Sequence, residues 1–170
     1  WDNVEPLYET EHDYKFGKGT WSWIVWQDNS INLEDQKKYV DLASEMGFQY
    51  TLVDNWWDTK IGKEGIEELV KYARSKNVEI FLWYSSSGNW NDIEQGPINI
   101  MSNPIKRKEY MRWMNKIGVK GIKVDFFGGD KQVTMAHYEA KEILYRYLIH
   151  WPWIAASLVL CLAATWLYLR

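Results

Sequence analysis

The sequence predicts an α/β fold, a partial (β/α)8 barrel of the TIM type, from three observations. Short apolar runs alternate four times with amphipathic stretches. The runs are rich in Val, Ile, Tyr, Phe and Trp, as in the buried strands of a parallel sheet. The first three runs begin near thirty residues apart, and a complete barrel takes about 250 residues, or about 31 for each βα unit. Residues 1–148 are therefore expected to hold about four units, half a barrel.

The four apolar runs are predicted as parallel strands. A flavodoxin-like open sheet of four or five strands is the alternative architecture, and it would be self-sufficient at this length. Against that alternative, the run Gln27-Asp28-Asn29-Ser30 follows the first strand where a Gly-rich phosphate-binding turn would be expected. The predicted strands cover residues 21–26, 49–55, 78–84 and 119–127.

Amphipathic helices are predicted after each strand. Asn32 is placed to cap the first helix and Gly47 to end it. Asn103, followed by Pro104 at the first helical position, opens the third helix. In the other two helices, apolar residues recur at the spacing of one helix face. The expected helices cover 33–46, a segment around 66–73 that ends near Asn77, 104–118 and a segment around 133–144.

Residues 149–170 are predicted as a separate apolar helix. From 149 to 169 no side chain carries a formal charge, if His150 is neutral. A bilayer span needs about 20 apolar residues, so the segment is a possible transmembrane helix. A buried helix, or a junction foreign to the domain of residues 1–148, is the alternative. Because position 1 is Trp, we expect a processed or excerpted chain.

Composition narrows the function classes. A formal net charge of −3 gives no basic excess for nucleic-acid binding. One Cys and three His cannot build a closed structural zinc site. The chain holds 12 Trp and 11 Tyr. Indole rings stack on the apolar faces of pyranose sugars, so this content is typical of either a sugar-binding surface or a Trp-rich core.

Carboxylates and indoles follow the predicted strands, at the edge where α/β folds place their sites. Strand alternation puts Lys123 and Asp125 on one face, pointing into the barrel mouth, and each favours the charged form of the other. Asp125 is therefore a candidate glycosidase nucleophile, or one member of an internal ion pair. Asp54 holds the matching position on the second strand, as an acceptor for sugar hydroxyls or a cap for the next turn.

Four tryptophans near these strand ends could form a stacking platform for sugar rings. For any single one of them, packing beneath a loop is the favoured interpretation. The platform candidates are Trp56, Trp57, Trp83 and Trp90. Asp54, Trp56 and Trp83 are the substrate-binding candidates among these residues, and no metal site made of histidine is visible in the sequence.

Four motifs in order carry a family resemblance: TWSWIVWQDNS, YVDLASEMGFQYTLVDNWWD, VEIFLWYSSSG and GVKGIKVDFFGGDKQ. Together they resemble glycoside hydrolase family 97, over residues 14–140. The resemblance implies an exo-acting α-glucosidase or α-galactosidase with a βα-barrel catalytic domain, acting on oligosaccharides. It also implies calcium dependence and export to the bacterial periplasm or cell surface. In retaining members the nucleophile is an Asp at the end of the fourth strand, and Asp125 in KVDFF matches it. Inverting members lack this Asp.

The resemblance therefore implies a retaining, α-galactosidase-like enzyme with Asp125 as nucleophile. Asp54, Trp56 and Lys123 match positions expected around the substrate. The family's acid/base Glu, and several calcium ligands, come from regions beyond the resemblance, and an apolar helix follows Glu139 where a fifth strand is expected. We therefore expect a glycosidase fragment that is inactive by itself. A catalytically inactive, membrane-tethered carbohydrate-binding fragment is the alternative.

Overall fold

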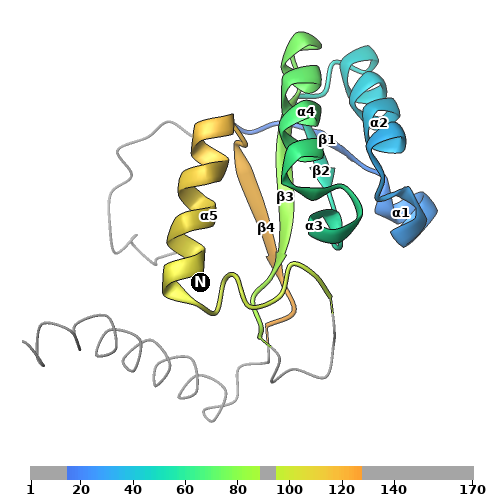
Figure 1. The fold of residues 1–170 in the computed structure, drawn as a ribbon. Coiled ribbons are helices and arrows are strands. Elements are labelled where there is room, and N and C mark those ends of the chain that lie inside the picture. Colours follow the sequence, from blue (N-terminus) through green and yellow to red (C-terminus); the bar gives the residue numbers. More distant parts are fainter. Residues whose placement is uncertain (1–14, 89–94, 128–170) are drawn as a thin grey trace, which may run out of the picture.

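The computed structural model describes residues 15–88 and 95–127 (Figure 1). Four parallel strands form one sheet in the order β1-β2-β3-β4. In a flavodoxin-like sheet the first strand would lie between the second and third, so the sequential order favours part of a TIM-type barrel. The strands are β1 (Gly19–Trp21), β2 (Tyr50–Val53), β3 (Glu79–Ser85) and β4 (Gly121–Asp125).

Helices alternate with these strands, as predicted. The Asn32 side chain accepts a hydrogen bond from the Asp35 N–H at 2.9 Å and so caps α2. Asn103 caps α5 in the same way, and Gly118 ends that helix with φ at +95°. The helical elements are α1 (Trp23–Trp26), the 3-10 turn η1 (Gln27–Ser30), α2 (Leu33–Glu45), α3 (Trp57–Lys60), α4 (Gly62–Ser75) and α5 (Pro104–Ile117).

The first strand differs from the prediction of a strand over residues 21–26. Strand β1 ends at Trp21, and the chain then turns into α1 because the Ser22 carbonyl accepts the N–H groups of Val25 and Trp26. Val25 is 65% exposed, so this end of the apolar run is not a buried strand. A short apolar run does not distinguish a strand from a helical turn by periodicity alone.

Burial separates the two faces of the sheet. Thr51, Val53, Ile80 and Leu82 are at most 1% exposed and lie in the layer between the sheet and the helices. Helix α2 contacts β1 and β2, and α4 contacts β3, on one side of the sheet (Figure 1). The other face carries half-buried residues, including Trp21, Leu52 and Lys123. In a barrel this second face would be the interior, which is where the candidate site begins.

Three expectations fall on parts of the chain that the structure does not describe. They are the helix around 133–144, the apolar helix of 149–170 and the domain boundary between 148 and 149. Among the helices of residues 15–88 and 95–127, none has the length and apolarity needed to cross a membrane.

Candidate functional site

Two even-numbered strands end in an aspartate with the same local geometry. The Oδ1 atom of Asp54, just past β2, accepts the N–H of Asn55 at 2.8 Å. The Oδ1 atom of Asp125, at the end of β4, accepts the N–H of Phe126 at 2.9 Å. Each carboxylate is therefore held by the backbone of the residue that follows it, and its Oδ2 atom remains free for side-chain donors.

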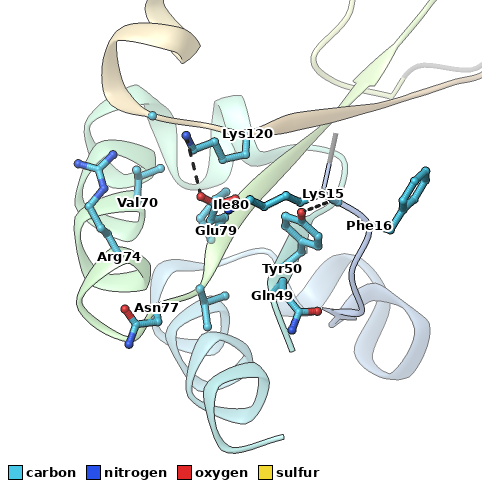
Figure 2. Close-up of a pocket in the computed structure, with 12 residues that line it drawn as sticks. Lys15, Phe16, Gln49, Tyr50, Val70, Arg74, Asn77, Glu79, Ile80 and Lys120 are labelled. Atoms are coloured by element: carbon cyan, nitrogen blue, oxygen red, sulfur yellow. Dashed lines mark hydrogen bonds and ion pairs between the residues drawn. The ribbon is translucent and has the colours of Figure 1, made fainter. Parts of the chain in front are cut away.

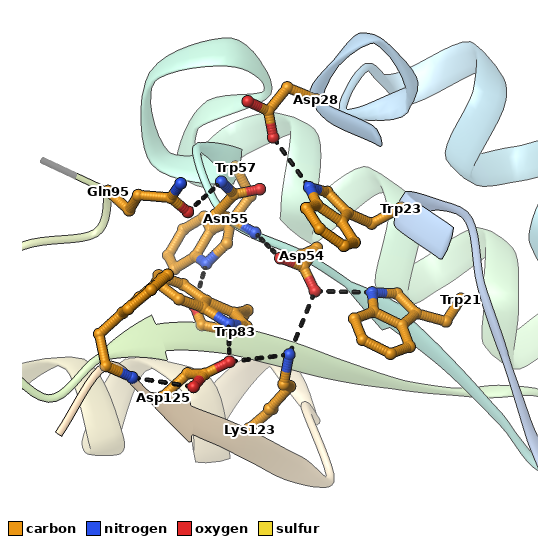
Figure 3. Close-up of polar contacts among 11 residues, drawn as sticks. Trp21, Trp23, Asp28, Asp54, Asn55, Trp57, Trp83, Gln95, Lys123 and Asp125 are labelled. Atoms are coloured by element: carbon orange, nitrogen blue, oxygen red, sulfur yellow. Dashed lines mark hydrogen bonds and ion pairs between the residues drawn. The ribbon is translucent and has the colours of Figure 1, made fainter. Parts of the chain in front are cut away.

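Indoles from the odd-numbered strands provide those donors (Figure 3). Trp21 of β1 donates its Nε1–H to Asp54 Oδ2 at 2.6 Å. Trp83 of β3 donates its Nε1–H to Asp125 Oδ2 at 3.4 Å, a longer and weaker contact. The register of β3 and β4 sets Trp83 opposite Lys123, which brings these side chains to one face of the sheet.

Lys123 joins the two carboxylates. Its Nζ lies 3.0 Å from Asp125 Oδ2 and 3.7 Å from Asp54 Oδ2. The same ammonium lies 4.3 Å from the centroid of the Trp21 ring, within range of a cation–π contact. The pairing of Lys123 with Asp125 that strand alternation predicts is therefore present, and the structure adds Asp54 and Trp21 to it.

Burial distinguishes the two carboxylates electrostatically. The Asp54 side chain is 5% exposed and that of Asp125 is 45% exposed. Burial raises the pKa of Asp54 above its ordinary value, although the Asn55 N–H, the Lys123 charge and the Trp21 indole oppose it. Burial acts in the same direction on Asp125, but the Phe126 N–H, Lys123 and Trp83 outweigh it and hold that pKa below its usual range.

The tryptophans of the expected platform have different environments. Trp83 is 1% exposed and Trp57 is fully buried, with the Trp57 indole donating to the Trp83 carbonyl at 2.8 Å. Trp56 is half-buried and has a left-handed backbone with φ at +62°. Its N–H donates to the Gly96 carbonyl at 2.7 Å. Trp90 lies outside the described residues.

Trp21 was not among the sequence-predicted site residues. The predicted strand 21–26 gave Trp21 no place at a strand end, whereas β1 in fact ends there. No local pattern in the sequence marks Trp21 as a strand end, because apolar residues follow Ser22 as far as Trp26. Trp23 stacks on Trp21 with ring centroids 6.0 Å apart, and it donates its Nε1–H to Asp28 Oδ1 at 2.9 Å.

The donor set at this edge does not suit calcium. Within residues 15–88 and 95–127, no group of three or more His, Cys, Asp or Glu side chains could hold a metal ion. Between Asp54 and Asp125 the Lys123 ammonium already provides the positive charge. Calcium binds through about six to eight oxygen ligands, so these residues do not form its site.

A separate hollow of about 670 Å³ lies at the opposite end of the sheet, where the strands begin (Figure 2). Tyr50 donates its hydroxyl to the Lys15 carbonyl at 2.6 Å, and Lys120 lies 3.9 Å from Glu79. This lining has no carboxylate held by indoles and a lysine, and ligands of α/β folds bind at the carboxyl ends of strands. The cluster around Lys123 is therefore the candidate site.

Comparison with known proteins gives matches over most of this chain. A model of the glycoside hydrolase 97 family matches residues 14–143. A retaining α-galactosidase of Bacteroides thetaiotaomicron is 31% identical over 151 residues, which are 78% of this chain and 20% of the relative. A probable retaining α-galactosidase of Streptomyces bingchenggensis is 29% identical over 135 residues, 72% of this chain and 19% of the relative.

One solved structure is also similar. The crystal structure of a β-arabinopyranosidase matches with a TM-score of 0.76 and 67% sequence identity, over 83% of this chain and 22% of that protein. The chain thus spans about a fifth of the length of the proteins it matches.

Proposed function

Because the chain belongs to the glycoside hydrolase 97 family, we propose that it forms the part of a retaining glycosidase that carries the nucleophile, Asp125. One observation supports this assignment above the others. Asp125 is the partly exposed carboxylate at the carboxyl edge of the sheet, and Phe126, Lys123 and Trp83 all donate to it. These donors favour its ionised form at neutral pH, which a glycosidase nucleophile requires.

In the proposed reaction an Asp125 oxygen attacks the anomeric carbon of the sugar. The new carbon–oxygen bond forms as the bond to the leaving group breaks, and a general acid protonates the leaving oxygen. The same acid then acts as a base for the water that releases the sugar and restores the Asp125 carboxylate. Phe126 and Lys123 hold the carboxylate oxygens in place through both steps.

Asp54 is poorly suited to be that general acid. Its side chain is 5% exposed, and its oxygens already accept hydrogen bonds from Asn55 and Trp21. A retaining enzyme needs a second carboxyl group about 5–5.5 Å from the nucleophile, with access to the leaving group. We assign this role to a residue outside the matched segment of residues 14–143.

The proposed substrate is a terminal pyranoside with the ring configuration of galactose. The curated relatives are retaining or probable retaining α-galactosidases, and the solved structure with 67% identity is a β-arabinopyranosidase. A β-L-arabinopyranosyl ring has the configuration of an α-D-galactopyranosyl ring without its exocyclic hydroxymethyl group. Within this proposal, the 33% exposed Lys123 side chain donates to ring hydroxyls and the half-buried Trp56 covers a sugar face.

A chimaeric enzyme tests the assignment of the nucleophile. In it, residues 14–143 replace the matching segment of the β-arabinopyranosidase, whose remaining chain provides the general acid. Asp125→Asn should abolish hydrolysis of an aryl glycoside. In Asp125→Gly, azide should restore turnover and give a glycosyl azide of inverted anomeric configuration, since azide takes the place of the missing carboxylate. Normal turnover by Asp125→Asn would overturn the proposal.

The same chimaera tests the substrate. We expect it to hydrolyse aryl β-L-arabinopyranoside and aryl α-D-galactopyranoside. Aryl α-D-glucopyranoside should react at least tenfold more slowly, because its 4-hydroxyl has the opposite configuration. A preference for the glucoside would contradict the proposed configuration. The alternative is a carbohydrate-binding fragment. It would be supported if sugar quenched the tryptophan fluorescence of the chain in a saturable way while the chimaera hydrolysed none of the glycosides.

A further inference from the structure

Trp21 has three contacts at the candidate site, and none of them is to a substrate position. Its indole N–H donates to Asp54 Oδ2 at 2.6 Å. Its ring lies 4.3 Å, centroid to Nζ, from the Lys123 ammonium. Its other neighbour is Trp23, which stacks on it at an interplanar angle of 19°. The polar edge and the ring of Trp21 are therefore both engaged by protein groups.

Lys123 needs such a support to act on a single carboxylate oxygen. A lysine has a flexible four-carbon stem and a compact ammonium, and it loses much rotamer freedom when it is fixed. The Lys123 side chain is 33% exposed, so packing alone does not hold it. Asp54 attracts the ammonium from β2, while the Trp21 ring attracts it from β1. Both attractions depend on the place of the Trp21 indole.

We propose that Trp21 is a positioning residue for Asp125, acting through Asp54 and Lys123. The indole N–H fixes the Asp54 carboxylate, and Asp54 and the indole ring together fix the Lys123 ammonium. Lys123 then stays beside Asp125 Oδ2, as Figure 3 shows, and keeps that carboxylate in one orientation. This inference rests on the proposed function, since it gives Trp21 a purpose only if Asp125 reacts.

The charged groups around Asp125 are few in the described chain. Lys123 comes from the same strand, and Asp54 faces Lys123 from β2. Strand β3, which pairs with β4, presents the uncharged indole of Trp83, and β1, which pairs with β2, presents that of Trp21. A looser Lys123 would therefore leave Asp125 with less positive charge nearby, and its pKa would rise toward the ordinary value.

An isosteric replacement separates the hydrogen bond from the packing. In the 170-residue chain, 3-benzothienylalanine at position 21 keeps the bicyclic ring and lacks the N–H. We expect the Asp125 carboxyl, followed by ¹³C NMR and identified with Asp125→Asn, to titrate at a pKa about half a unit higher than in the unchanged chain. Lys123→Gln gives the upper limit of this shift. An unchanged Asp125 titration beside a clear shift in Lys123→Gln would overturn the proposal.

Trp113 offers a matched control. Its indole N–H donates to Glu67 Oε1 at 2.9 Å, between α5 and α4, and it lies away from the Lys123 cluster. The same benzothienyl replacement at position 113 removes a hydrogen bond of the same kind. It should leave the Asp125 titration unchanged. A shift of equal size at both positions would mean that Asp125 responds to general loosening of the fold, and the proposal would fail.

Kinetics of the chimaera distinguish positioning from sugar binding. Removing the Trp21 N–H should lower kcat about tenfold, leave KM nearly unchanged and move the acidic limb of the pH profile upward. A raised KM with an unmoved limb would mean that Trp21 contacts the sugar, which contradicts the proposal. The NMR titration does not depend on turnover, so an Asp125→Asn chimaera with normal activity would overturn the proposed function and leave the titration result standing.

Discussion

Asp54 and Asp125 end alternate strands of the sheet and receive their donors in the same pattern. Each accepts the following backbone N–H at Oδ1, and each accepts an indole N–H and the Lys123 charge at Oδ2. They differ in exposure, at 5% for Asp54 and 45% for Asp125. The pKa of Asp54 is raised because burial dominates, whereas that of Asp125 is lowered because its donors dominate.

Under the proposed function, this difference separates the roles of two similar carboxylates. A buried carboxylate with both oxygens engaged stabilises its neighbours, because little of its surface meets a ligand. A partly exposed one with a lowered pKa keeps its charge and has room for a reacting atom. Chemical type and strand position are the same in both cases, and solvent access separates them. Five predictions test this contrast.

The largest effect is expected from removing Asp125. In the chimaera, Asp125→Ala should lower kcat by about 10⁴-fold, because no other described group is placed to replace the proposed nucleophile. The free energy of unfolding of the chain should change by less than about 1 kcal/mol, since the side chain is partly exposed. Initial rates and urea denaturation measure the two quantities. An Asp125→Ala variant that kept its activity, or that unfolded, would contradict the role proposed for Asp125.

Removing the shared charge should have the next largest effect. Lys123→Gln should lower kcat/KM about 100-fold and raise the pKa of Asp125, because that carboxylate loses its ammonium partner at 3.0 Å. The acidic limb of the pH profile of the chimaera measures this shift. If the limb stayed in place, Lys123 would not control the charge of Asp125.

Asp54→Ala should act mainly on stability. The N–H groups of Asn55 and Trp21 would lose their acceptor in a buried setting, at a cost of about 2 kcal/mol. Urea denaturation followed by tryptophan fluorescence measures the loss, and Asp125→Ala is the matched variant with the smaller expected loss. If both variants lost the same free energy of unfolding, the different burial of Asp54 and Asp125 would not separate their contributions to stability.

The pH dependence of stability should have opposite signs at the two carboxylates. Above about pH 3.9, the ordinary Asp pKa, the folded chain retains a proton on Asp54 that the unfolded chain has lost. The contribution of Asp54 to the free energy of unfolding therefore falls as pH rises from about 3.9 through the raised pKa of Asp54. The stabilisation from Asp125 is present above about pH 3.9 and is lost as pH falls through its lowered pKa.

Urea midpoints measured against pH compare the two groups. Asp54→Asn should remove a decline in stability on raising the pH, and Asp125→Asn should remove a rise. Two variants whose pH curves change in the same direction would contradict the assigned pKa directions.

The smallest effect is expected at an exposed ion pair. Lys37 Nζ lies 2.6 Å from Glu68 Oε1, a shorter distance than any from Lys123, but the Glu68 side chain is 57% exposed. Lys37→Gln should change the free energy of unfolding by less than about 0.5 kcal/mol, because water competes for both charges. Lys37→Gln is the matched control for Lys123→Gln. If both substitutions lowered the free energy of unfolding equally, the contacts of Lys123 would stabilise the fold no more than an exposed ion pair does.

Much of the fold follows from local patterns in the sequence. The caps at Asn32 and Asn103 and the glycine stops gave α2 and α5 within one residue, because capping is decided by a few neighbouring atoms. Strand alternation placed Lys123 beside Asp125. The first strand was wrong because WSWIVW is apolar apart from Ser22, and a short apolar run does not distinguish a strand from a helical turn.

The site is harder to predict from the sequence than the fold, because it depends on contacts between strands. Asp54 and Lys123 are far apart in the chain, and only the sheet order brings them within 3.7 Å. The role of Trp21 depends on where β1 ends. The opposite pKa directions of Asp54 and Asp125 depend on exposure, which two similar strand-end motifs do not reveal. The expected roles of Asp54, Trp56, Trp83 and Lys123 toward a substrate, and of Asp125 as nucleophile, stay predictions.

Covalent trapping tests the identity of the nucleophile directly. A 2-deoxy-2-fluoro glycoside of the substrate sugar, with a dinitrophenol leaving group, slows the release of the glycosyl–enzyme more than its formation, so the covalent species accumulates. After proteolysis of the trapped chimaera, mass spectrometry should find the fluorosugar on the peptide that contains Asp125, and fragmentation should place it on that residue. The adduct should be missing in Asp125→Asn. A fluorosugar attached to Asp54 or to any residue outside this chain would contradict the assignment of the nucleophile.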